Sequence, residues 1–228
     1  IERISSFYDL IEKAEKPVVS IGGDHSVTGG IVQSLAKKNS KLTKGKKITL
    51  VHFDAHTDCY EKLDHFLGAK KSAAHWASYL VKQGNVDPHT STQIGIRGNP
   101  RTLDWLQASY DIGYQVITMD EFREHGYEKC SKMILDRLGN NPIYITFDLD
   151  CLDANVAPGT ANLEPAFRGF NIDEAIKLIQ SLKGKNVIGG DVVCLMPTKD
   201  SPNQITSMVA ASIMFEIICL ISVNLKNK

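Results

Sequence analysis

Histidine and aspartate residues gather in four short segments of this chain of 228 residues. The segments are Gly23-Asp24-His25, Asp54-Ala55-His56-Thr57-Asp58, Asp148-Leu149-Asp150 and Gly189-Gly190-Asp191. In the second and third segments the potential ligands occupy every second position, so an extended backbone would point them to one side. Ionised carboxylates that converge near a core repel one another strongly unless cations lie between them. The pattern predicts a hydrolytic site that holds two divalent cations.

Each segment also has a simpler explanation when it is taken alone. A Gly-Gly-Asp-His sequence after a strand could be a turn whose aspartate caps a helix, and Asp-x-Asp occurs in many Mg²⁺ and phosphate enzymes. Asp54, His56 and Asp58 form the most specific pattern, because three alternating ligands rarely serve solvation alone. The first three segments each follow an apolar run with strand character, and this conjunction favours the metal site.

The elements that must position these residues alternate between strand and helix. Strands are expected at 17–22, 48–54, 92–96, 115–119, 143–148 and 186–194, and helices at 26–38, 72–83, 102–109, 127–138, 172–182 and 204–221. This order predicts an α/β fold with three α/β/α layers and a mainly parallel sheet. The carboxyl ends of parallel strands share one rim, where such folds bind ligands.

Composition narrows the class of partner. Lys+Arg and Asp+Glu number 26 each, so the balance does not favour nucleic acid, and a small molecule is the expected ligand. Five widely spaced cysteines without a CxxC pattern indicate a reducing compartment, which predicts a cytoplasmic location. The longest apolar stretch, 208–223, is interrupted by Ser212 and Glu216 and is short for a membrane span, so we expect a buried helix and no membrane.

Three longer segments around the candidate ligands resemble the signatures of the ureohydrolases, the arginase and agmatinase family. They are Ser20 to Ser26, His52 to Asp58 and Thr146 to Asp153, supported by Ala157-Pro158-Gly159-Thr160 and 190–193. The segments 87–88 and 93–98 look more like agmatinases than arginases. The resemblance implies an arginase-like fold in which 1–228 form one ureohydrolase domain, with a family N-terminal segment missing before Ile1.

The resemblance also implies a ligand set and a reaction. One manganese ion, Mn²⁺, would be held by His25, Asp54, Asp58 and Asp148, and a second by Asp54, His56, Asp148 and Asp150. A water held between the two ions would lose a proton and attack the carbon of an agmatine-like guanidino substrate, which gives urea and an amine. Asp150 would steady this nucleophile and help to protonate the departing nitrogen. Relatives are commonly trimers or hexamers, so a homo-oligomer is expected.

His75 is the predicted proton relay, because its spacing before Asp87-Pro88 resembles that of the family's relay histidine. The simpler explanation is a partly buried histidine at a helix start, and His65 is the competing candidate for the relay. His52 is expected to fill the core or to support a ligand from behind.

The chain departs from the family pattern at the substrate side of the site. Cys194 stands where most guanidino-hydrolysing members have the glutamate that pairs with the guanidinium, so it is a candidate substrate-binding position. The simpler explanation is a small residue on a buried strand, and with Cys59 and Cys151 it could also be an oxidation-sensitive thiol. The segment 159–163 reads Gly-Thr-Ala-Asn-Leu in place of Gly-Thr-Gly-Thr-Pro.

Several functions therefore stay open at the level of sequence. The first is a dinuclear Mn²⁺ amidinohydrolase of the agmatinase type, and its rivals are an arginase, a guanidino-acid hydrolase and a formimidoyl-amino-acid hydrolase. A single-zinc amidohydrolase like the histone deacetylases would not need His25 and Asp58 as ligands. A catalytically impaired metal-binding homologue, acting as a binding or regulatory subunit, is the alternative from another class.

Overall fold

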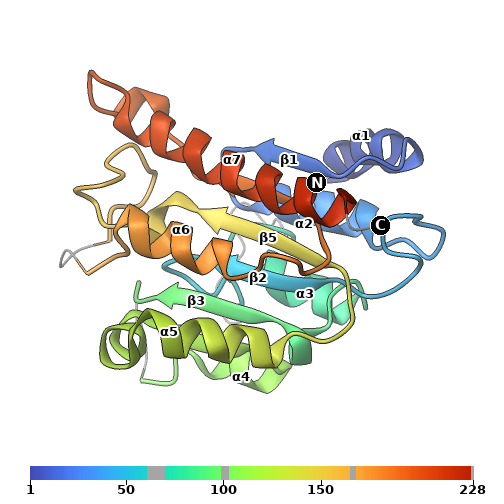
Figure 1. The fold of residues 1–228 in the computed structure, drawn as a ribbon, viewed down its shortest axis with the longest axis horizontal. Helices are drawn as coiled ribbons and strands as arrows, with labels where there is room; N and C mark the ends of the chain where they lie inside the picture. Colours follow the sequence, from blue (N-terminus) through green and yellow to red (C-terminus); the bar gives the residue numbers. More distant parts are fainter. Residues whose placement is uncertain (61–69, 99–102, 165–167, 227–228) are drawn as a thin grey trace.

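A single parallel sheet organises the chain. The computed structural model describes residues 1–60, 70–98, 103–164 and 168–226. Six strands lie in the order β1-β6-β5-β2-β3-β4, and every neighbouring pair is parallel (Figure 1). They are β1 (Val18–Ile21), β2 (Thr49–Phe53), β3 (Thr92–Ile96), β4 (Gln115–Thr118), β5 (Ile143–Asp148) and β6 (Val187–Val193). The predicted α/β class with a parallel sheet is confirmed.

Helices cover both faces of this sheet. Helices α1 (Glu2–Lys13), α2 (Ser26–Leu35), α3 (Trp76–Lys82) and α4 (Gln107–Ile112) pack on one face, and α5 (Met119–Arg137), α6 (Ile172–Gln180) and α7 (Ile205–Lys226) on the other (Figure 1). Successive strand residues point to opposite faces. Leu50 therefore packs in the core under α1, α2 and α3, while Val51 and Phe53 pack in the core under α5, α6 and α7. The chain also has three short 3₁₀ helices. Of these, η2 (Pro88–Thr90) precedes β3, η3 (Leu149–Cys151) follows β5, and η4 (Pro197–Lys199) lies between β6 and α7. The three predicted layers are present.

Three helices differ from the sequence prediction. Helix α1 was not expected, and it forms against α2, with Ile4 and Tyr8 packed into the core of that face. Helix α5 begins at Met119 rather than 127, because Thr118 and Glu121 form a capping box and Gly126, at φ 76°, kinks the helix where the prediction began it. The helix expected at 102–109 is displaced to α4.

The displacement of α4 has a local cause. Residue 102 lies outside the described residues, and Leu103, which was expected on the apolar face, is fully exposed. The helix instead ends at Gly113, whose φ of 110° suits a left-handed C-terminal cap. The strand prediction next to it is correct to within one residue, since β4 begins at Gln115 as expected.

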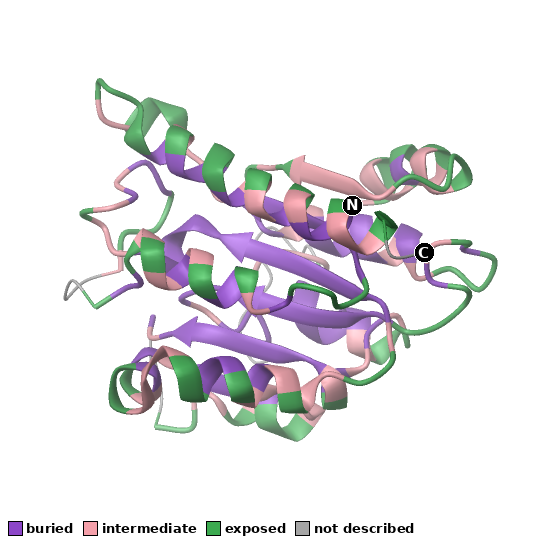
Figure 2. Ribbon diagram, in the orientation of Figure 1, coloured by how far each residue is buried: buried purple, intermediate pink, exposed green. Residues whose placement is uncertain are grey.

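Helix α7 packs one face into the core, as expected of a buried helix, while its other face is exposed. Val209, Ile213 and Ile217 pack into the core on the side of β6 and β1. The opposite face exposes large apolar side chains: Met208, Phe215, Ile218 and Leu225. Figure 2 shows exposed, intermediate and buried stretches alternating along α7. Among the described residues, α7 is the one helix long and apolar enough to cross a membrane, although its inner face belongs to the core of the sheet.

Candidate metal centre

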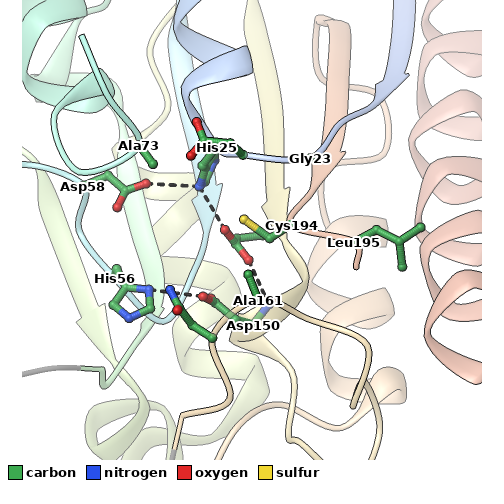
Figure 3. A pocket seen from close by; sticks show the side chains of 12 residues that line it. Gly23, His25, His56, Asp58, Ala73, Asp150, Ala161, Cys194 and Leu195 are labelled. Carbon is green, nitrogen blue, oxygen red and sulfur yellow. Dashed lines mark hydrogen bonds and ion pairs between the residues drawn. The ribbon is translucent and has the colours of Figure 1, made fainter. Parts of the chain in front are cut away.

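Three of the four predicted segments meet at one rim of the sheet, at the carboxyl ends of β1, β5 and β2. The fourth, Gly189-Gly190-Asp191, lies within β6, between β1 and β5, where Asp191 contacts Thr146 behind the rim. A cavity of about 260 Å³ opens there (Figure 3). Its lining is mostly carboxylates, imidazoles and small side chains: Gly23, Asp24, His25, His56, Asp58, Ala73, Asp148, Asp150, Ala161, Asn162, Cys194 and Leu195. Strands that are far apart in sequence thus deliver their polar ends to one place, as expected.

His25 is surrounded by carboxylates on one side of its ring. Its Nδ1 atom lies 2.9 Å from Asp54 Oδ2 and 3.1 Å from Asp58 Oδ2. The same atom lies 3.2 Å from Asp148 Oδ2. The residue is 1% exposed, and Nδ1 makes no hydrogen bond of regular geometry. A buried nitrogen that faces three carboxylate oxygens without a hydrogen bond is the geometry that a bound cation would complete.

The other ring nitrogen of His25 fixes the tautomer. Nε2 lies 2.9 Å from Thr146 Oγ1, and the hydroxyl of Thr146 donates its single proton to Asp191 Oδ1 at 2.6 Å. Asp191 also accepts from the hydroxyls of Thr28, at 2.8 Å, and Tyr144, at 2.9 Å. Since the Thr146 oxygen must accept, Nε2 carries the proton. In the neutral ring, the lone pair of Nδ1 therefore points at the carboxylates.

His56 repeats this arrangement on the other side of Asp54. Its Nδ1 atom lies 3.3 Å from Asp54 Oδ1 and 3.2 Å from Asp150 Oδ2. Its Nε2 atom lies 2.7 Å from Glu164 Oε1, which as an ionised carboxylate can only accept. Nε2 therefore carries the proton, and the Nδ1 lone pair of the neutral ring again faces carboxylate oxygens.

Backbone amides fix the orientation of the carboxylates. Asp54 Oδ1 accepts from the amide of His56 at 2.7 Å, and Asp148 Oδ1 accepts from the amide of Asp150 at 2.9 Å. Asp150 Oδ1 accepts from the amide of Ala55 at 3.1 Å. In Asp148 and Asp150, one oxygen is thus held by the backbone while the other faces a histidine nitrogen. Such a preset arrangement is what a metal site requires of its ligands.

The electrostatics of the cluster show how much negative charge it concentrates. Burial and the charges of Asp148 and Asp54 raise the pKa of Asp150 well above its ordinary value. Burial and Asp54 likewise raise the pKa of Asp58. For His25, burial opposes the charged form, but the neighbouring carboxylates outweigh it and raise the pKa well above the usual value. Two groups of side chains could each hold a cation, and Asp54 belongs to both: His25, His52, Asp54 and Asp58, and Asp54, His56 and Asp150.

His52 supports Asp54 rather than offering a lone pair. The amide nitrogen of Gln93 lies 3.2 Å from His52 Nδ1, so Nδ1 accepts and Nε2 carries the proton. Nε2 then donates to Asp54 Oδ2 at 2.8 Å. The position of His52, behind Asp54 and 0% exposed, agrees with the expectation of a core or supporting histidine.

Several residues of the site were not found from the sequence. Trp76 donates from Nε1 to Asp58 Oδ2 at 2.6 Å, and its ring lies 4.7 Å from that of His25. Thr146 and Glu164 hold the two histidines from behind. One signal was available for Thr146: His52, Thr146 and Asp191 are polar residues at the same register in three adjacent strands.

The predicted relay and substrate residues have different locations. His75 is buried at the N-terminal end of α3, with its Nδ1 atom 2.6 Å from Ser72 Oγ, and it does not line the cavity. Ala73 lines the cavity in its vicinity (Figure 3). The competing candidate, His65, lies outside the described residues.

Cys194 does line the cavity (Figure 3). It follows the last residue of β6 and takes a left-handed conformation, with φ of 65°, while its amide donates to the carbonyl of Gly23 at 2.6 Å. Burial and the charges of Asp148 and Asp150 raise the pKa of its thiol well above the ordinary value. The position predicted for the substrate contact thus faces the site, but with a neutral thiol.

Known proteins with similar sequences and structures carry the same fold. The model of the arginase family matches residues 1–220. The agmatinase of Salmonella paratyphi B is 34% identical over 217 residues, which cover 95% of this chain and 64% of that protein. The chain therefore spans less than two thirds of the length of this relative. A hypothetical agmatinase from Burkholderia thailandensis has a TM-score of 0.80 at 32% identity, covering 95% of this chain and 63% of the other. The proclavaminate amidino hydrolase of Streptomyces clavuligerus has a TM-score of 0.85 at 29% identity, covering 97% and 69%.

Proposed function

This chain belongs to the arginase family, and on that premise we propose that it is a metal-dependent hydrolase of C–N bonds in linear amidines. The proposed substrate is an agmatine-like guanidino compound, and the products are urea and an amine. The observation that carries the proposal is the pair of buried histidines, His25 and His56. Each is held from behind by a hydrogen bond at Nε2, and each directs Nδ1 at a group of carboxylate oxygens. Asp54 belongs to both groups.

We propose two Mn²⁺ ions per chain as the cofactor. The first would be held by His25, Asp54, Asp58 and Asp148, and the second by Asp54, His56, Asp148 and Asp150. Four carboxylates and two imidazoles form a hard, oxygen-rich donor set, which suits Mn²⁺ better than a thiophilic ion. The fit is supported by the unpartnered Nδ1 atom of His25 and by the carboxylates that converge on it.

Bound there, two divalent cations would supply a nucleophile by lowering the pKa of a water molecule between them. The chain's own contribution is to position groups. The amide of Ala55 holds Asp150 Oδ1 at 3.1 Å, which leaves Oδ2 at the cavity. From this position we propose that Asp150 orients the nucleophile and passes a proton to the departing nitrogen.

We propose that His75 acts as the proton relay, a role that requires its side chain to change conformation. Its imidazole must leave Ser72 and turn toward the cavity, because Ala73 occupies the lining there. We propose His75→Asn as the test, with Ser72→Ala as the matched control that frees the imidazole without removing it. Loss of turnover in the first variant alone would support a relay, whereas equal turnover in the first variant and the unaltered protein would refute it.

The charge of the cavity favours a substrate that carries no carboxylate. Among the described residues, no lysine or arginine lines the cavity, while Asp24 adds a further carboxylate to its lining. An anionic group on the substrate would meet negative charge there without a partner. This supports agmatine over arginine, a guanidino acid or a formimidoyl amino acid, although a family glutamate is replaced by Cys194.

A second candidate function is favoured by two specific positions. Cys194 offers a thiol where a carboxylate was expected, and Ala73 faces the cavity near the expected relay. A metal-binding homologue with impaired turnover, acting as a regulatory or binding subunit, would show both features.

One experiment separates these functions. The protein is reconstituted with Mn²⁺, and urea release is measured with agmatine, arginine and 4-guanidinobutyrate, while ammonia or formamide release is measured with formimidoylglutamate. Turnover of agmatine above that of the acids is expected. Two bound ions with no turnover on any substrate would establish the impaired homologue, and a Cys194→Glu variant that then gained activity would identify the lost contact.

The wider setting is also proposed. We propose a cytoplasmic location, which fits the free thiols of Cys130, Cys151, Cys194 and Cys219, and a homo-oligomer, a trimer or hexamer. We propose that residues 1–228 act as one ureohydrolase domain on a small-molecule substrate, without a nucleic-acid or membrane partner. Gel filtration at several protein concentrations tests the oligomeric state.

A further inference from the structure

The contact between His56 and Glu164 joins two distant parts of the chain behind the second cation position. The two residues are 108 positions apart, and His56 Nε2 lies 2.7 Å from Glu164 Oε1. Each side chain is 12% exposed, so water has little access to the pair. A charge-assisted hydrogen bond in such a place is stronger than one at the surface.

The chain leaves room for this pair at Gly98. A Cβ atom at residue 98 would lie 2.7 Å from His56 Nε2 and 2.7 Å from the carboxyl carbon of Glu164. The backbone cannot easily retreat, because the amide of Gly98 donates to the carbonyl of Ala55 at 2.8 Å. A side chain at residue 98 would therefore displace at least one member of the pair, and glycine leaves both in place.

The two histidines of the centre differ in what holds them. His25 donates to Thr146, whose hydroxyl relays the contact to Asp191. His56 contacts the carboxylate of Glu164 directly. A carboxylate that accepts from the outer nitrogen of a histidine fixes its tautomer and increases its basicity as a ligand. The second cation position is therefore supported by a single carboxylate that stands outside the ligand set.

We propose that Glu164 is a positioning residue that holds His56 Nδ1 on the second cation, and that Gly98 is required for this contact. This rests on the proposed two-cation function. Removal of the Glu164 carboxylate should weaken the second ion and leave the first in place. The affinity of the second ion should fall by about 10- to 100-fold.

The test compares four variants of the full chain with the unaltered protein. Glu164→Ala removes the acceptor, Glu164→Gln keeps a carbonyl oxygen that can still accept, and Gly98→Ala separates the pair while both partners remain. Asp153→Asn is the matched control, because it removes a carboxylate near the start of the same connection, where Asp153 accepts from the amide of Asn155. Thermal unfolding and circular dichroism establish that each variant is folded.

The readouts are bound Mn²⁺ per chain after dialysis and the Mn²⁺ electron paramagnetic resonance spectrum. The unaltered protein and Asp153→Asn should retain two ions and give the signal of a spin-coupled pair. Glu164→Ala and Gly98→Ala should retain one ion and give the signal of an isolated Mn²⁺. Glu164→Gln should lie between these, since its carbonyl oxygen restores part of the contact.

The outcomes distinguish the two proposals. Fewer than two ions in the unaltered protein would overturn the two-cation function itself. Two equally tight ions in the unaltered protein and in both Glu164→Ala and Gly98→Ala would overturn the role of Glu164. Equal loss of both ions in these variants would show a general structural role and would also overturn it. If Glu164→Ala does not fold, Glu164→Gln and Gly98→Ala decide the matter.

Discussion

Replacing Thr146 by valine should weaken both the fold and the first cation position, because one hydroxyl connects His25 to Asp191. The Thr146 oxygen accepts from His25 Nε2 at 2.9 Å and its proton goes to Asp191 Oδ1 at 2.6 Å. Valine has nearly the same shape but neither function. Thr146 is 0% exposed, so no bulk water can replace the lost partner.

The magnitude follows from the groups that are left behind. The Nε2–H group of His25 would be buried without an acceptor, which costs about 1 to 3 kcal/mol. Asp191 would lose one of three hydroxyl donors but keep Thr28 and Tyr144, a smaller loss of roughly 1 kcal/mol. The free energy of unfolding should therefore fall by about 2 to 4 kcal/mol in the metal-free protein. The affinity for the first ion should fall by about 10- to 100-fold, since the histidine is no longer held.

Thr146→Ser is the matched control for this prediction. It keeps the hydroxyl and removes a buried methyl group, which should cost only about 1 kcal/mol. Urea denaturation of both variants in a chelator measures stability, and isothermal titration with Mn²⁺ measures affinity. Equal stability and equal Mn²⁺ affinity of the valine and serine variants would refute the role assigned to the hydroxyl.

Three further predictions test other parts of the structure. In a Trp105→Phe variant, Mn²⁺ should quench the fluorescence of Trp76, whose ring centroid lies 4.7 Å from that of His25; fluorescence unchanged at saturating Mn²⁺ would contradict that placement. Asp200→Asn should cost about 1 kcal/mol in urea denaturation at pH 7. Although burial opposes its charge, amides at the start of α7 lower the pKa of Asp200, so its stabilisation is present above its unfolded pKa and is lost as the pH falls through the folded value. A cost that does not shrink between pH 7 and pH 3 would contradict this. Gly29→Ala should lower the free energy of unfolding by about 1 to 3 kcal/mol, because its Cβ would lie 1.8 Å from the hydroxyl of Tyr79, and an unchanged thermal midpoint would contradict this packing.

Much of the candidate site could be predicted because strand periodicity is a strong signal. The apolar runs before His25, Asp54 and Asp148 identify strands, and parallel strands bring their carboxyl ends to one rim without further information. The alternation of ligands in 54–58 then places the side chains on one side. These steps depend on local sequence and predict that the three segments converge, whereas the full ligand set of His25, Asp54, His56, Asp58, Asp148 and Asp150 is what the resemblance to the family implies.

The site residues that were not predicted are placed by tertiary packing, and local sequence does not show which way their side chains point. Glu164 reaches His56 from a loop, and Trp76 reaches Asp58 from a short helix, so their targets are decided by tertiary packing. The relay role of His75 stays a prediction, because its imidazole lies beside Ser72 and does not line the cavity in this conformation. Helix α7 is apolar on all sides, so its composition could not show that one face is exposed.

The measurement that tests the central claim most directly is the position of bound manganese. Crystals of the protein grown with Mn²⁺ would give an anomalous difference map at the rim of β1, β6, β5 and β2. The structure predicts two peaks, one beside His25 Nδ1 and Asp58, and one beside His56 Nδ1 and Asp150, with Asp54 between them. A single peak, or none, at saturating Mn²⁺ would contradict the two-cation centre.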